Sequence, residues 1–179
     1  MKVNDSERLS YQLMTEDDAE LLYQLDQDPK VMLYINGGKV SSMAEIVDVF
    51  IPRVKAFSNP ILGWGLWKVT VKADQSFIGW ILIRPMEFFT SNPEFDNLEI
   101  GWRFKQSSWG HGYATEAALA VKSVVEQDSS VMKISAIADV GNNASIMVMK
   151  KIGLTYQKNH LYKGPMGDMQ VVYYQQIID

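Results

Sequence analysis

The sequence predicts an α+β fold built as one domain over residues 1–179, and three features point to it. Residues 64–84 hold two segments rich in β-branched and aromatic side chains around a short polar turn, which is typical of an antiparallel hairpin. Residues 98–138 read as a strand, a glycine-containing segment, a helix and a second strand, which is a βαβ unit. Residues 154–177 indicate a closing hairpin. We find no internal repeat or linker, so one domain is expected.

The N-terminal part is expected to hold one strand and two helices. Residues 8–14 indicate the strand. Thr15, with a carboxylate three positions later, is typical of a helix N-cap, and that helix should stop before Pro29 because proline disfavours helical backbone in the residue before it. Ser42 is also followed by a carboxylate three positions later and opens a second helix, which Pro52 should kink or end.

The middle of the chain changes to a β-type pattern. Residues 64–71 and 77–84 indicate the two strands of a hairpin. Residues 85–97, with two prolines and two asparagines, indicate a loop. Residues 98–104 indicate the next strand, and after a glycine-containing segment the apolar pattern predicts a helix over residues 113–127.

The C-terminal part is expected to complete the sheet. Residues 131–138 are almost all apolar and indicate a strand parallel to the one before the helix. Residues 142–151 indicate a short helix that Gly153 ends, because glycine tolerates the left-handed conformation found after helices. The last two strands are predicted at residues 154–161 and 170–177, around a turn at residues 163–167.

Composition excludes several classes of function. The chain has 17 Lys and Arg against 21 Asp and Glu, a net charge of −4, which disfavours nucleic acid as a ligand. Without cysteine there is no disulfide, thiol nucleophile or thiolate metal site, and His111 and His160 are too few for a histidine-rich one. No apolar run approaches the roughly 18 residues of a membrane span, and the first ten residues lack the apolar core of a signal peptide. We therefore expect a cytoplasmic enzyme or binding protein without a metal.

The glycine-containing segment Trp109-Gly110-His111-Gly112-Tyr113-Ala114-Thr115 is a candidate phosphate site. It lies between a strand and a helix, and its two glycines lack the Cβ atoms that keep a ligand away from the backbone. The first N–H groups of the following helix lack a partner inside the helix and carry the positive end of its dipole. The segment therefore suits a phosphate group, although a strand-to-helix turn without a ligand has the same pattern.

Two nucleotide-binding motifs fit this segment poorly. A Walker loop needs a lysine after its last glycine, but Gly112 is followed by tyrosine and alanine. A dinucleotide fingerprint needs a third glycine at the position of Thr115 and an acidic residue about 20 positions on, for which Asp139 is a candidate. That fingerprint usually follows the first strand of its fold, whereas here three β segments precede the strand that leads into it.

Several motifs resemble one family along nearly the whole chain. The strand LEIGWRF at residues 98–104 and the segment WGHGYATEA at residues 109–117 resemble the CoA-binding core of GNAT N-acetyltransferases, in the RimJ/RimL-like branch. The segment NNASIMVMKKIGL at residues 142–154 is similar to another signature of that branch. Residues 7–9 and 15–19 are similar to its opening. The resemblance is specific for the family and uninformative about the substrate.

The resemblance implies the GNAT fold and a site for acetyl-CoA. In that fold a mixed sheet has two neighbouring parallel strands that splay apart, by position residues 98–104 and 131–138. Main-chain groups of Trp102 and Phe104 would pair with the pantetheine arm. Asn142 and Ser145 would contact that arm as well, although they also read as a helix N-cap and first-turn residue. The pyrophosphate would be bound by Trp109, Gly110, His111, Gly112, Tyr113, Ala114 and Thr115.

The chain departs from the wider superfamily at two positions that bear on the chemistry, besides Leu154 in place of the usual Phe, which concerns core packing. Ser107 stands where a Gln or Arg often precedes the glycines, so backbone donors must carry the phosphate site. Met149 stands where many members have a tyrosine that protonates the departing thiolate, and a thioether has no proton to give. The general acid is therefore not the usual one.

Three residues are candidates for the chemistry that the resemblance implies. Transfer to an amine needs a base, a donor for the developing oxyanion and an acid for the thiolate. Glu99 is the candidate base, turned toward the acceptor by a bulge expected near Gly101, although it could equally be a structural ion pair or an exposed strand residue. The N–H of Trp102 is the candidate oxyanion donor. Ser145 is the candidate acid, while His111 is expected to act through its main chain.

The predicted function is transfer of an acetyl group from acetyl-CoA to a primary amine in a ternary complex. The acceptor would be a protein or peptide N-terminus or a small-molecule amine. The alternative is a regulatory module that binds acyl-CoA and turns over weakly. Tyr156, Tyr162 and the segment with Phe88 and Phe89 are candidate acceptor walls. If residues 170–177 form an exposed sheet edge, a homodimer could cover it.

Overall fold

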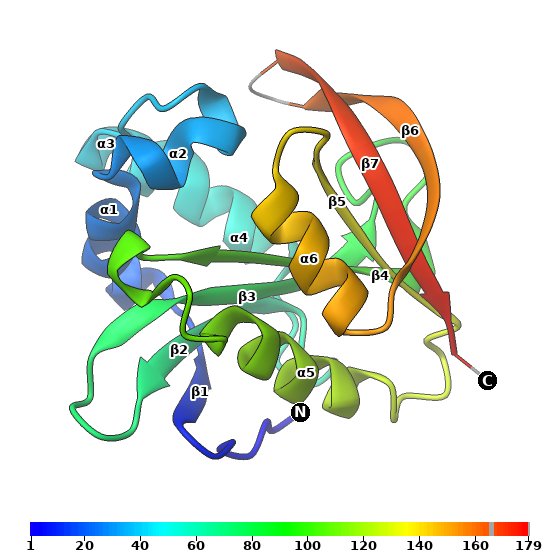
Figure 1. The fold of residues 1–179 in the computed structure, drawn as a ribbon, viewed down its shortest axis with the longest axis horizontal. Coiled ribbons are helices and arrows are strands. Elements are labelled where there is room, and N and C mark those ends of the chain that lie inside the picture. The colour runs from blue at the N-terminus through cyan, green and yellow to red at the C-terminus, as the bar shows by residue number, and fades with distance from the viewer. Residues whose placement is uncertain (165–166, 179) are drawn as a thin grey trace.

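Seven strands form one sheet within residues 1–164 and 167–178, which the computed structural model describes (Figure 1). Their order across the sheet is β1-β2-β3-β4-β5-β7-β6, so strands from both ends of the chain belong to it. The bounds are β1 Leu9–Leu13, β2 Gly65–Val71, β3 Phe77–Met86, β4 Glu94–Phe104, β5 Lys133–Asp139, β6 Thr155–Gly164 and β7 Gly167–Ile177. The mixed α+β sheet predicted from the sequence is confirmed.

The parallel pair sits in the middle of an otherwise antiparallel sheet. β1 to β4 form an antiparallel meander, β4 and β5 are parallel, and β5, β7 and β6 are again antiparallel. Helix α5 connects β4 to β5, as a parallel neighbour requires. The predicted βαβ unit is therefore present.

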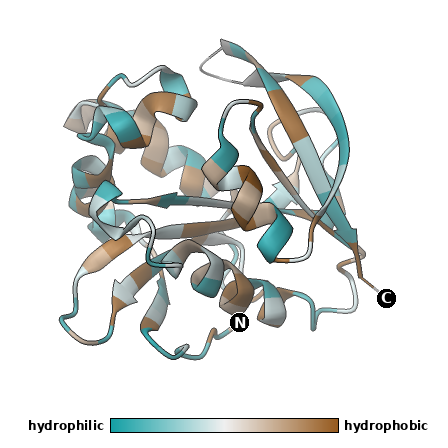
Figure 2. Cartoon of the chain, in the orientation of Figure 1, coloured by the Kyte–Doolittle hydropathy of each residue, from teal (hydrophilic) through white to brown (hydrophobic). Residues whose placement is uncertain are grey.

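Helices cover both faces of this sheet. The helical elements are η1 Glu16–Asp18, α1 Ala19–Asp26, α2 Pro29–Asn36, α3 Met43–Glu45, η2 Ile46–Phe50, α4 Ile51–Phe57, η3 Gln106–Ser108, α5 Tyr113–Val125 and α6 Asn143–Lys151. Val121 of α5 and Met149 of α6 belong to one apolar core cluster, while Leu25 of α1 and Phe57 of α4 belong to a second. Figure 2 shows β3 largely apolar and the outer strand β6 largely hydrophilic.

Side chains of β4 alternate between these two faces. Leu98, Ile100 and Phe104 belong to the cluster beneath α5 and α6. Glu99 and Arg103 therefore project to the opposite face, where α1 to α4 pack, because successive side chains of a strand point to opposite sides. The strand thus presents apolar groups to one layer and charged groups to the other.

Two helical predictions need correction. Pro29 follows the end of the first helix, as expected, but it also starts α2, which the sequence reading missed. The Asp28 side chain accepts a hydrogen bond from the Lys30 N–H and Pro29 occupies the first turn, where its missing N–H costs nothing. Pro52 was expected to kink or end the second helix, and the alternative that it ends the helix is wrong: it lies in the first turn of α4, directly after the π-helical turn η2.

Three strand predictions also need correction. β4 starts at Glu94, so the loop predicted over residues 85–97 is shorter. The predicted bulge near Gly101 is absent, because the register of β3 and β4 is regular from Arg84 to Gly79. β7 lies between β5 and β6 and is no edge, so the reason for expecting a dimer there was wrong. The predicted turn at residues 163–167 includes 165–166, which lie outside the described residues.

Candidate functional site

The parallel strands β4 and β5 part after three paired positions. Asn97 pairs with Lys133, Leu98 with Ile134 and Glu99 with Ser135, and no register pair follows among the described residues. β4 nevertheless continues to Phe104 and β5 to Asp139. Backbone polar groups along the facing edges beyond Glu99 therefore have no strand partner. An extended ligand with amide groups can pair with such edges as an added strand does.

A polar network closes the paired end of this opening. The buried Ser135 hydroxyl donates to the Asn97 side-chain oxygen at 2.7 Å and lies 2.7 Å from the Tyr173 hydroxyl. The Gln175 amide donates to the Ser135 hydroxyl at 3.0 Å and to the Tyr173 hydroxyl at 2.8 Å. Because buried polar groups are costly without partners, this network holds β4, β5 and β7 at one spacing. It fixes the point from which the strands diverge.

The glycine segment after β4 has the backbone of a phosphate cradle. Gly110 and Gly112 both have φ of +79°, a left-handed conformation that favours glycine. A Cβ built on Gly110 would meet nothing within 4 Å, so the segment faces open space there. Gly112 is the N-cap of α5 and supplies no side-chain cap, which leaves the first N–H groups of the helix to an outside acceptor. The geometry fits a phosphate.

Side chains of the segment brace it against β4. The Trp109 indole N–H donates to the Phe104 carbonyl oxygen at 2.9 Å. The His111 and Tyr113 rings stack at 5.6 Å between centroids. The Phe104 carbonyl predicted to face pantetheine is thus already engaged on one lone pair.

Glu99 lies where the strands part and is held by an arginine. Its Oε2 accepts from Arg84 Nε at 2.7 Å, and the two side chains are only 10% and 16% exposed. Burial alone would lower the pKa of Arg84, but the Glu99 carboxylate, with a smaller contribution from Tyr162, leaves that pKa raised. Oε1 of Glu99 accepts no hydrogen bond from the described residues. The structural ion pair that the sequence offered as an alternative role for Glu99 is therefore present. The second carboxylate oxygen of Glu99, Oε1, remains available to a substrate.

A model of the GNAT acetyltransferase domain matches residues 8–155 of the chain. The chain belongs to the GNAT acetyltransferase family. Its parted strands, glycine segment and uncapped α5 fit acetyl-CoA, the acyl donor expected from the sequence.

Relatives and solved structures are similar to the chain over most of its length. An uncharacterized protein of Bacillus subtilis, YkkB, is 34% identical over 143 residues, which are 79% of this chain and 78% of the relative. An FsC-acetyl coenzyme A-N(2)-transacetylase of Aspergillus fumigatus is 27% identical over 87% of this chain and 66% of its own. The structure of RimL, a ribosomal L7/L12 alpha-N-protein acetyltransferase in complex with coenzyme A, superposes with a TM-score of 0.76 at 17% identity, covering 100% and 99% of the two chains.

The start of α6 places Asn142 and Ser145 of this acetyltransferase together. The Asn142 side-chain oxygen accepts from the Ser145 N–H at 3.1 Å, so Asn142 caps the helix as its residue type suggests. The Ser145 hydroxyl has no hydrogen-bond partner among the described residues. Met149, one turn further on, is fully buried and packs in the core. It fills space where many family members would present a tyrosine hydroxyl.

The face around Glu99 includes one of the two predicted tyrosines. Tyr162 lies near Arg84, whose pKa it helps to raise. Tyr156 instead pairs across the strands with Tyr174, which belongs to the core cluster on the opposite face, so it does not join Glu99. The Phe88 and Phe89 rings pack edge-on at 5.1 Å, and the guanidinium of Arg84 lies 5.6 Å from the Phe89 ring.

Arg84, Tyr173 and Gln175 are site residues that the sequence reading missed. Arg84 interrupts an apolar strand, and a charged residue there signals a buried partner. The partners of Tyr173 and Gln175 depend on strand register, which no local pattern reveals.

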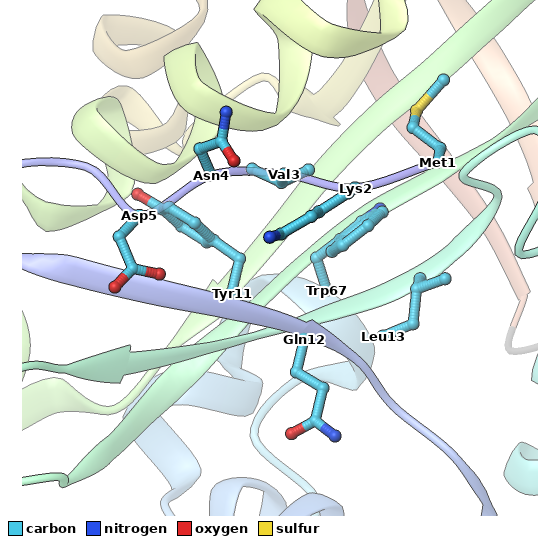
Figure 3. Close-up of a pocket in the computed structure, with 9 residues that line it drawn as sticks. All are labelled: Met1, Lys2, Val3, Asn4, Asp5, Tyr11, Gln12, Leu13 and Trp67. Atoms are coloured by element: carbon cyan, nitrogen blue, oxygen red, sulfur yellow. The ribbon is translucent and has the colours of Figure 1, made fainter.

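A separate cavity of about 510 Å³ lies far from Glu99 in the fold, against β1 and the N-terminal segment (Figure 3). The side chains of Lys2, Tyr11 and Trp67 line it together with residues of that segment. None of the predicted site residues lines it, so it lends no support to the acetyl-CoA site. A ligand that pairs with strand edges needs an opening between two strands, which this cavity does not provide.

No helix in the part of the chain that is described is long and apolar enough to cross a membrane.

Proposed function

We propose that this acetyltransferase moves an acetyl group from acetyl-CoA to a primary amine, a peptide N-terminus or a small-molecule amine, within one domain over residues 1–179. The parting of β4 and β5 directly after Glu99 and Ser135 carries the proposal, because it puts a carboxylate at the base of an opening with free strand edges. Direct transfer in a ternary complex suits a chain without cysteine.

In this proposal the main chain does most of the acetyl-CoA binding. Trp102 and Phe104 on β4 offer backbone groups to the pantetheine arm, and Asn142 and Ser145 border the other side. Support for the pyrophosphate site comes from the left-handed glycines and the uncapped N-terminus of α5. The residues assigned to that site are Trp109, Gly110, His111, Gly112, Tyr113, Ala114 and Thr115.

Three groups share the chemistry. The spare Oε1 of Glu99 takes the proton from the acceptor ammonium, directly or through one water, which frees the nitrogen lone pair to attack the thioester carbonyl. The Trp102 N–H donates to the carbonyl oxygen as charge develops there. The attached nitrogen loses its second proton to solvent as the tetrahedral intermediate collapses. The Ser145 hydroxyl, which has no described partner, gives a proton to the departing thiolate and recovers one from solvent. Glu99 then releases its proton to solvent.

The acceptor assignment rests on the polarity of the face around Glu99. The Glu99 carboxylate, whose Oε1 has no described partner, gives an ammonium a charge partner there. The Phe89 ring, already contacted by the guanidiniums of Arg53 and Arg84, forms an aromatic wall beside it. The similar proteins include an FsC-acetyl coenzyme A-N(2)-transacetylase and a ribosomal L7/L12 alpha-N-protein acetyltransferase. Both names place the acetyl group on a nitrogen, which supports an amine as the acceptor.

Thiol release tests the proposal. Purified protein and acetyl-CoA are mixed with a lysine-free peptide that has a free N-terminus, with the same peptide blocked at its N-terminus, or with a small polyamine. We expect free thiol to appear only with acceptors that carry a free amine, together with a mass increase of one acetyl group. Thiol release that does not depend on the amine would contradict the proposal.

A further inference from the structure

The side chain of Arg8, next to the first strand of the sheet, contacts the main chain of the glycine segment at residues 109–115. Arg8, at the residue before β1, donates from Nη1 to the His111 carbonyl oxygen at 3.0 Å. The two residues are 103 positions apart in the sequence. The guanidinium also lies 4.6 Å from the centroid of the Tyr113 ring, which stacks on His111.

Glu116 in the first turn of α5 holds this arginine in place. Glu116 Oε2 accepts from Arg8 Nε at 2.7 Å and lies 2.6 Å from Nη2. Glu116 Oε1 accepts from the Arg8 backbone N–H at 2.9 Å and from the Ser6 hydroxyl at 2.7 Å. Burial would raise the pKa of Glu116, but the hydrogen bonds from Arg8 and Ser6 outweigh it and lower that pKa. Both oxygens of Glu116 are thus used to fix Arg8.

The hydrogen bond from Arg8 to the His111 carbonyl also fixes the direction of the Gly112 N–H. The carbonyl of His111 and the N–H of Gly112 belong to one planar trans peptide, so they point in opposite directions. With the carbonyl held toward Arg8, the Gly112 N–H is held away from it. Glycine has little conformational preference of its own, so without this contact the peptide could rotate.

We propose that Arg8 is a positioning residue for the pyrophosphate of acetyl-CoA: it fixes the His111–Gly112 peptide so that the Gly112 N–H faces the phosphate. The inference rests on the pyrophosphate site proposed above. Arg8 acts through the peptide and through Glu116, and it does not itself bind the phosphate. Its effect is therefore confined to ligands that carry a pyrophosphate.

The test compares three ligands by NMR titration, which reads dissociation constants up to the millimolar range. The ligands are CoA, 3′-dephospho-CoA, which keeps the pyrophosphate, and S-acetylpantetheine, which lacks it. The variants are Arg8→Met, which keeps the side-chain length, Arg8→Lys and Ser6→Ala. Arg53→Met makes the same change on α4 and serves as the control.

For Arg8→Met we expect CoA and 3′-dephospho-CoA to bind about tenfold more weakly, the worth of one hydrogen bond to a charged group. Binding of S-acetylpantetheine should stay within twofold of wild type. Arg8→Lys should recover only part of the loss, because an ammonium cannot bridge Glu116 and the His111 carbonyl as the planar guanidinium does. Ser6→Ala should cause a smaller loss of the same kind, and Arg53→Met none.

Three results would overturn the inference. Unchanged CoA binding in Arg8→Met would show that the peptide needs no support. A loss with CoA but not with 3′-dephospho-CoA would make Arg8 a direct ligand of the 3′-phosphate. An equal loss with S-acetylpantetheine would indicate general damage. If Arg8→Met does not fold, Arg8→Lys and Ser6→Ala must still show the pyrophosphate-specific loss. Failure of the wild type to bind CoA would instead refute the proposed function.

Discussion

Two arginine–glutamate pairs of similar geometry lie at opposite ends of the proposed site. In the pair of Arg84 and Glu99 the closest atoms are 2.7 Å apart and the side chains are 16% and 10% exposed. In the pair of Arg8 and Glu116 they are 2.6 Å apart and the side chains are 43% and 17% exposed. The difference that matters is in the carboxylates: Glu99 keeps one oxygen without a described partner, whereas both oxygens of Glu116 are occupied.

This contrast teaches that the same ion pair can serve chemistry or geometry according to what else surrounds it. A carboxylate with a spare oxygen can accept a proton from a substrate. A carboxylate whose lone pairs are filled can only hold its partners. The exposed pair gains little Coulomb energy because water screens it, so its value lies in the backbone groups that it positions.

The strongest test of the contrast is Glu99→Gln. We expect acetyl transfer to fall by about 100-fold to 1,000-fold, the contribution of a general base, while acetyl-CoA binds as in the wild type. Steady-state thiol release and calorimetry measure the two quantities. Glu16→Gln, in the exposed pair with Lys55, is the matched control and should keep full activity. Turnover of Glu99→Gln within threefold of wild type would remove Glu99 from the mechanism.

The next largest effect is expected on stability. Arg84→Met leaves the Glu99 charge without its partner at a largely buried position and should lower the free energy of unfolding by about 2–4 kcal/mol. Urea denaturation measures it. Arg8→Met should lower it much less, and adding Glu99→Gln to Arg84→Met should restore part of the loss. If Arg8→Met is as destabilising as Arg84→Met, burial does not distinguish the two pairs.

A matched pair of glycines separates backbone strain from ligand contact. Gly110 and Gly37 have φ of +79° and +78°, and a Cβ on either would meet nothing within 4 Å. Valine at either position should therefore cost a similar free energy of unfolding, about 1–2 kcal/mol. Only Gly110→Val should also weaken acetyl-CoA binding, by tenfold or more, because its side chain occupies the phosphate position. Equal binding by both variants would place the phosphate elsewhere.

The smallest effect is expected from His160, on the face shared with Glu99. Burial, with Lys158 adding to it and Glu87 opposing it, lowers the pKa of His160 below 6.5. The ring packs edge-on against Tyr173, and Nδ1 is buried without a described partner. Since the folded pKa lies below the unfolded one, the stabilisation is present above pH 6.5 and is lost as the pH falls. Urea denaturation of His160→Gln should therefore show a shallower loss of stability from pH 7.5 to pH 5; an unchanged slope would contradict this.

The sequence predicted the parts of the molecule that depend on local pattern. The βαβ unit, the glycine segment and α5 follow from apolar periodicity and from residues that tolerate a left-handed backbone. Helix α2 was missed because Pro29 can end one helix and start the next, and only the hydrogen bond from the Lys30 N–H to Asp28 distinguishes the two.

The contacts that define the site were harder to predict because they join distant residues. Arg84 meets Glu99 through the register of β3 and β4. Arg8 and Glu116 are 108 positions apart and meet because β1 and α5 pack at the same end of the molecule. The sequence pattern shows that a charged residue such as Arg84 is unusual in an apolar strand. The partner of such a residue becomes visible only in the folded structure.

The most direct test of the central claim is calorimetric titration of the purified protein with acetyl-CoA, with NAD as the control. The claim is that the opening between β4 and β5 and the start of α5 together bind this donor. We predict a micromolar dissociation constant for acetyl-CoA and no measurable binding of NAD. No binding of acetyl-CoA, or equal binding of both compounds, would contradict the account.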